Sequence, residues 1–137
     1  MPKGGTWLNQ MLLQGPFLCL CIKEEEFLYE MRRADVRSPS DWVSDGSDAT
    51  THFVSQHGES ATFVCIDVDT KKPKIESHML LVHEAVHVWR HRADALGLSR
   101  SDEEVEAYAI QHIATRLVMA FEDRMGRKKF APRRRKK

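Results

Sequence analysis

The chain has 137 residues, 42% of them apolar, which is enough to form the core of one domain and excludes a wholly disordered chain. No segment approaches the roughly 18 consecutive apolar residues of a membrane-spanning helix, because the longest apolar stretch, 11–22, is interrupted by Gln14, Gly15 and Pro16. That stretch also lacks a small-residue cleavage site. We therefore expect no signal peptide and no membrane association, and a location that is cytoplasmic or set by a partner.

The net charge of +1 conceals an uneven distribution along the chain. Nine of the 21 basic residues follow Asp123, and the residues before them carry 12 basic against 20 acidic side chains, a net charge of −8. This pattern indicates an acidic body with a basic C-terminal tail rather than a basic nucleic-acid-binding domain. Three roles are open for the tail: binding nucleic acid through its phosphates, docking on an acidic protein surface, or forming a solvated end.

The N-terminal third predicts a short strand between two helices. A helix is expected to begin at Thr6, because the apolar residues at positions 7, 8, 11 and 12 share one side, and to end at Gly15-Pro16. The nearly continuous apolar run 17–22 is typical of a buried strand. Residues 23–33 follow as a helix with glutamates at its N-terminus, and the polar stretch 35–50 is expected to be a surface loop.

The remainder of the chain predicts a hairpin followed by two long helices. Residues 51–55 and 61–68 have the composition of strands, joined by a short link that contains His57 and Gly58. Helical periodicity then runs from about residue 75 to 96, where Gly97 is the expected C-cap. A second helix is expected to begin at a capping Ser99 or Ser101 and to reach about residue 125. The whole order predicts an α+β fold with a small mixed or antiparallel sheet of about three strands.

The three cysteines, Cys19, Cys21 and Cys65, are an odd number without the spacing of a disulfide framework. All three fall in predicted strands, so we expect reduced, buried thiols. A metal site at Cys19 and Cys21 would need two further ligands with similar spacing, and the sequence contains none.

The segment that carries chemistry is His83-Glu84-Ala85-Val86-His87. Residues four apart are neighbours on one face of a helix, so both imidazoles can reach one metal ion, and Glu84 projects beside that face. Leucines and valines flank the motif, so we expect a buried helix, in which two histidines and a glutamate are costly unless they pair or bind a metal. The alternative is a solvent-facing helix with incidental histidines.

Zinc requires a third protein ligand and an open position for water. His91 lies eight residues beyond His83, about 12 Å along the helix axis, which is too far for three imidazoles to share one ion in tetrahedral geometry. The next predicted helix offers Glu106, which shares a face with apolar residues and should point inward. Glu103, one turn earlier, is the alternative ligand, whereas Glu104 is expected to project away.

The HExxH motif at 83–87 and the Glu-x-Glu-Ala motif at 104–107 resemble the compact gluzincin metallopeptidases, in particular the prophage-associated ImmA/IrrE-like group. The resemblance covers about residues 61–120 and implies His83, His87 and Glu106 as zinc ligands with Glu84 as catalytic base. It implies one zincin-like domain over residues 1–125, in which the sheet packs against the HExxH helix and the glutamate helix, and a basic tail over 126–137. It also implies that one strand of the predicted hairpin, with 61–68 as the candidate, lines the cleft and can pair with an extended peptide.

The function that this resemblance implies is hydrolysis of peptide bonds by a zinc-activated water, with Glu84 as general base and a protein or peptide as substrate. The sequence does not fix the residue that stabilises the oxyanion, for which Tyr108, His52, His57 and His91 are candidates. The alternative function is a non-catalytic, zinc-stabilised module that binds protein partners, as a phage accessory or structural protein would. A phage-encoded chain would then be virion-associated rather than cytoplasmic. Glu84 favours the enzyme, because a structural zinc site has no need of that carboxylate.

Overall fold

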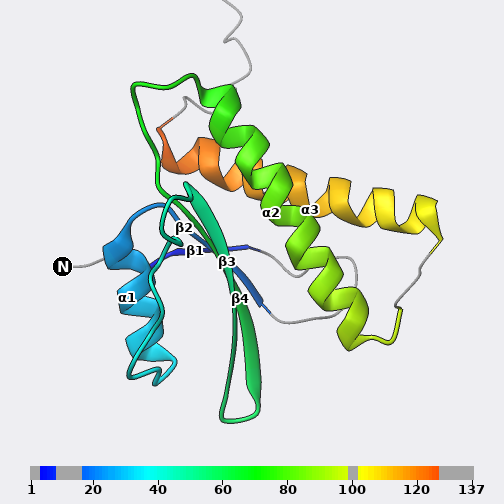
Figure 1. Cartoon of the computed structure of the whole chain (residues 1–137), viewed down its shortest axis with the longest axis horizontal. Coiled ribbons are helices and arrows are strands. Elements are labelled where there is room, and N and C mark those ends of the chain that lie inside the picture. The colour runs from blue at the N-terminus through cyan, green and yellow to red at the C-terminus, as the bar shows by residue number, and fades with distance from the viewer. Residues whose placement is uncertain (1–3, 9–16, 99–101, 127–137) are drawn as a thin grey trace, which may run out of the picture.

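The computed structural model describes residues 4–8, 17–98 and 102–126, and within them three helices and a four-stranded mixed sheet (Figure 1). The predicted α+β class is confirmed, with one strand more than the expected three. The elements in chain order are β1 (Thr6–Trp7), β2 (Phe17–Cys21), α1 (Glu24–Arg33), β3 (Ala49–Gln56), β4 (Glu59–Ile66), α2 (Lys74–Ala95) and α3 (Glu103–Arg124). Among the described residues, no helix combines the length and apolarity needed to cross a bilayer.

The additional strand is β1, where the sequence predicts the start of a helix. Thr6 and Trp7 pair antiparallel with Leu20 and Cys19 of β2, and the Leu8 amide donates to the Leu18 carbonyl at 2.8 Å. The helix prediction is therefore wrong at Thr6–Trp7. The backbone groups there are hydrogen-bonded to a strand ten or more residues further along the chain, and a local sequence pattern does not indicate such a partner. The rest of the predicted helix, 9–16, lies outside the described residues.

The strand order β1-β2-β4-β3 places β4 in the interior of the sheet. β4 pairs in parallel with β2 and antiparallel with β3, so it is hydrogen-bonded along both edges. The expectation that the strand 61–68 pairs with a peptide is therefore wrong, since its backbone groups already have partners. The edge strand next to α2 is β3, and the predicted hairpin between β3 and β4 is confirmed.

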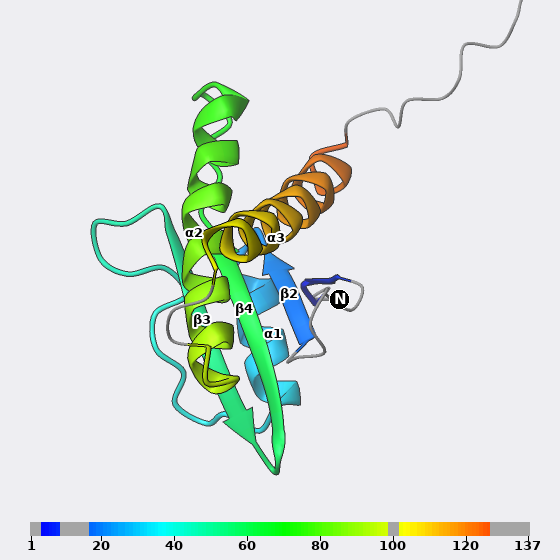
Figure 2. The same ribbon diagram turned by 90° about the vertical axis from the view of Figure 1, so that its right-hand side faces the viewer.

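Helices cover both faces of the sheet (Figure 2). Successive residues of a strand point to opposite faces. Cys19 and Cys21 thus face α1, whereas Leu18 and Leu20 belong to the core that α2 and α3 close. This two-sided burial explains why β2 is a nearly continuous apolar run. The three cysteines are buried and free, as expected, and burial raises the pKa of the Cys65 thiol.

Short-range signals set the ends of α2 and α3. Gly97 and Gly126 follow the two helices with φ of 74° and 76°, a left-handed backbone that glycine adopts without strain. The N-cap of α3 is Asp102, whose carboxylate accepts from the Glu104 amide at 2.8 Å, and the serines predicted for this role lie outside the described residues. The C-terminal end of α3 is tied to the sheet edge because Arg124 donates to Thr6 Oγ1 at 3.0 Å.

Candidate metal centre

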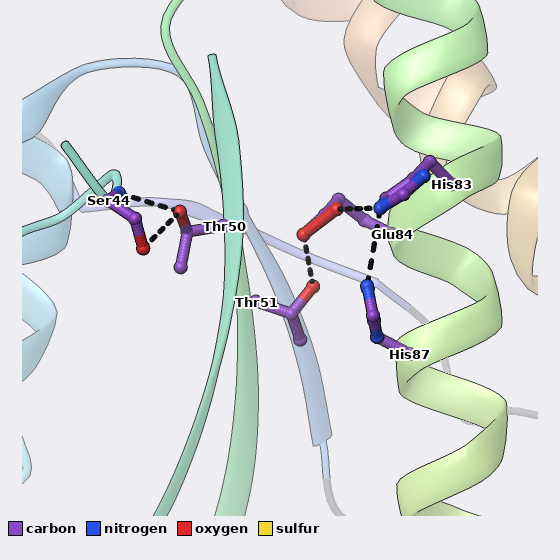
Figure 3. A network of polar contacts seen from close by, with 6 residues as sticks. All are labelled: Ser44, Thr50, Thr51, His83, Glu84 and His87. Atoms are coloured by element: carbon purple, nitrogen blue, oxygen red, sulfur yellow. Dashed lines mark hydrogen bonds and ion pairs between the residues drawn. The ribbon is translucent and has the colours of Figure 1, made fainter. Parts of the chain in front are cut away.

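His83 and His87 lie one turn apart on α2 and direct their imidazoles toward each other (Figure 3). Their Nε2 atoms are 3.3 Å apart. Two nitrogens bound to one zinc ion at about 2.1 Å in tetrahedral geometry are separated by about 3.4 Å. The donor types and their separation therefore fit a shared zinc ion without rearrangement of the helix.

Glu84 turns from the same helix toward β3, between the histidines and the sheet (Figure 3). Its carboxylate is buried, accepts a hydrogen bond from Thr51 Oγ1 at 3.0 Å, and lies 3.9 Å from His83 Nε2. One ligand atom from each of His83, Glu84 and His87 lies within 4.8 Å of the others. The structure thus brings together three of the four residues that the sequence predicts for the site.

The burial of this site differs from the prediction. The His83 side chain is 68% exposed and His87 is also exposed, whereas Glu84 is 5% exposed. The expectation of buried histidines is wrong because α2 buries its other side, with Leu81, Ala85, Val88 and Trp89 in the core. Both imidazoles lie on the exposed side of α2, and Glu84 is the buried member of the three.

An open groove between β3 and α2 contains the three residues. Thr51 and Phe53 line it from β3, and His91 and Asp94 line it from the C-terminal half of α2. Phe53 and His91 stack with ring centroids 3.8 Å apart and planes 10° apart, and so wall the groove beyond His87. His91 is therefore a residue at the rim of the groove.

Three of the four candidates for stabilising the oxyanion lie away from this groove. His52 bonds to the Trp42 carbonyl at 2.8 Å, and His57 pairs with Asp35 at 3.2 Å. Tyr108 is exposed on α3 and lines a separate surface. His91 is the candidate that lines the groove.

Glu106, the predicted third ligand, is half-buried and is not part of the three-residue cluster. Its carboxylate is 22% exposed and forms an ion pair with Arg90, Nη2 to Oε1 2.8 Å. Glu103, the alternative ligand, is exposed. The third ligand therefore stays a prediction.

Sequence reasoning missed Thr51, Phe53 and Arg90. Thr51 and Phe53 are two residues apart on β3 and therefore share one face of the strand. This spacing could have indicated both as groove residues, but only with the knowledge that β3 lies beside α2. Arg90 carries no such signal, because its pairing depends on how α2 and α3 cross. The basic tail from residue 127 onward lies outside the described residues.

Comparisons with protein-family models, with curated proteins and with solved structures found no match for this chain.

Proposed function

We propose that the protein is a zinc-dependent metallopeptidase of the gluzincin type. The observation that carries the proposal is the 3.3 Å separation of the His83 and His87 Nε2 atoms beside the buried Glu84 in an open groove. A zinc ion there would supply a water of lowered pKa and a Lewis acid for the substrate carbonyl. A purely structural site would need neither the groove nor a carboxylate held at its floor.

Glu84 is the proposed general base. Its position beside both imidazoles puts a carboxylate within reach of a water held between them, and the hydrogen bond from Thr51 fixes its rotamer. Glu84 would accept the proton of the attacking water and pass it to the leaving amine.

The proposed substrate is an extended peptide lying along β3. β3 is the edge strand beside α2, so its outer backbone groups are available for strand addition next to the histidines. Thr51 would then lie beside the scissile bond, and the stacked rings of Phe53 and His91 would close the groove on the side beyond His87. This proposal keeps the role expected for one strand of the hairpin and assigns it to β3 instead of the candidate 61–68.

Glu106 is the proposed third zinc ligand. It belongs to the first turn of α3 and pairs with Arg90, which lies three residues, about one helical turn, beyond His87 on α2. A carboxylate with two imidazoles completes the donor set of a catalytic zinc site and leaves one position open.

The test compares the purified wild type with Glu84→Gln, by metal analysis and by digestion of a mixed peptide library followed by mass spectrometry. We expect about one zinc per chain in both proteins and cleavage by the wild type alone. Absence of zinc from the wild type would overturn the proposal. Bound zinc with no cleavage by either protein would support the zinc-stabilised interaction module instead.

A further inference from the structure

We propose that Arg90 competes with the metal ion for Glu106, so that an ion pair between α2 and α3 sets the metal affinity of the site. This inference rests on the proposed zinc site but concerns a residue that the hydrolytic mechanism does not use. In the structure the Glu106 carboxylate is engaged by Arg90 rather than joined to the cluster of His83, Glu84 and His87.

The proposed exchange involves the side chains of Glu106 and Arg90. The Glu106 amide is bonded to the Asp102 carbonyl at 3.0 Å within the first turn of α3, so its backbone is already fixed. The Arg90 side chain is 60% exposed and can move into solvent when it releases the carboxylate. Metal binding would therefore break one ion pair between a largely exposed guanidinium and a half-buried carboxylate.

Charge decides the direction of the effect. The guanidinium of Arg90 is cationic, as in arginine side chains generally, and it lowers the affinity of the Glu106 carboxylate for any second cation. It also stands one turn from His87, where it repels a divalent ion held by the histidines. Both effects weaken metal binding, and both decrease as salt screens exposed charges.

The size of the effect is limited by the exposure of the guanidinium, because the Arg90 side chain is 60% exposed although that of Glu106 is 22% exposed. Solvent screens such a pair from the arginine side, so we expect its loss to change the dissociation constant of the metal by at most about fivefold. We expect Arg90→Gln to bind zinc about 2- to 5-fold more tightly than the wild type, and Arg90→Lys, which keeps the charge, to stay close to the wild type.

The experiment measures zinc affinity by competition with a chromophoric chelator, at about 0.05 M and about 0.5 M salt. The difference in zinc affinity between Arg90→Gln and the wild type should be smaller at the higher salt concentration. Arg32→Gln is the matched control, because Arg32 is an exposed helical arginine on α1, which packs on the other face of the sheet, and its loss should leave the affinity unchanged.

Glu106→Gln separates this inference from the proposed function. If that variant binds zinc as tightly as the wild type, Glu106 is not a ligand and the competition does not exist. If Glu106→Gln weakens binding but Arg90→Gln leaves it unchanged or weakens it, the zinc site stands and the role assigned to Arg90 is overturned. If no protein in the series binds zinc, both proposals fail.

Discussion

Replacing Thr51 by valine removes the hydrogen-bond donor that holds the Glu84 carboxylate under the histidines. The substitution keeps the β-branched shape of the side chain, so the pairing of β3 with β4 should persist. What is lost is the 3.0 Å bond from Thr51 Oγ1 to Glu84 Oε1.

The expected cost follows from the burial of the acceptor. The Glu84 side chain is 5% exposed, so water cannot fully replace the missing hydroxyl. A hydrogen bond to a charged group contributes about 1.5–3 kcal/mol. For a chain of 137 residues, the unfolding entropy of about 0.3 kcal/mol per kelvin converts this into a Tm lower by about 5–10 °C.

Thermal and urea unfolding at neutral pH, in buffer that contains a chelator, would measure the difference. Thr50→Val is the matched control, because Thr50 is the next residue on β3 and bonds to Ser44 on the opposite face (Figure 3). Its loss should cost about 1 kcal/mol or less. In a Glu84→Gln background, Thr51→Val should also cost about 1 kcal/mol or less, because the acceptor is then neutral. Equal losses for Thr51→Val and Thr50→Val in the wild type would refute the view that Glu84 is a buried charge held by Thr51.

Three further predictions concern the core and the opposite face of the sheet. Burial raises the pKa of Glu30, and a hydrogen bond from Trp7 opposes this shift. Glu30 therefore stabilises the fold at pH values below the pKa that it has in the unfolded chain, and this stabilisation is lost as the pH rises through its pKa in the folded protein. In the Glu30→Gln variant, the free energy of unfolding measured with urea should therefore depend less on pH above about pH 4.5 than in the wild type. The same pH dependence in both proteins would contradict this role of Glu30. Gly5→Ala should destabilise the fold by about 1–3 kcal/mol, because the added Cβ would lie 2.5 Å from Cys19 Sγ; unchanged urea unfolding would contradict this. Leu117→Ala, at a fully buried position of α3, should cost about 2–5 kcal/mol, and a loss below about 1 kcal/mol would contradict its place in the core.

The elements that the sequence predicts well are those with local signals. The β3–β4 hairpin follows from strand composition around His57 and Gly58, and the ends of α2 and α3 follow from Gly97 and Gly126. The spacing of four residues between His83 and His87 likewise predicts that both lie on one face, provided only that the segment is helical.

The features that sequence reasoning could not supply depend on pairing between distant segments. β1 is a strand only because β2 lies beside it, and β4 is interior only because β2 pairs with it in parallel. The exposure of His83 and the burial of Glu84 follow from which side of α2 the sheet covers. The ion pair of Arg90 with Glu106 likewise requires the crossing of two helices, which periodicity cannot reveal.

The parallel pairing of β2 with β4 also has a consequence for how the chain folds. Cys21 and Cys65 lie opposite each other across 44 residues, whereas the β3–β4 hairpin closes over a two-residue turn. Closing the longer loop costs more conformational entropy and slows folding. His83, Glu84, His87 and Thr51 all belong to the hairpin and the helix that follows it. Substitutions in the first twenty residues should therefore have a larger effect on the folding rate than on the arrangement of these four side chains.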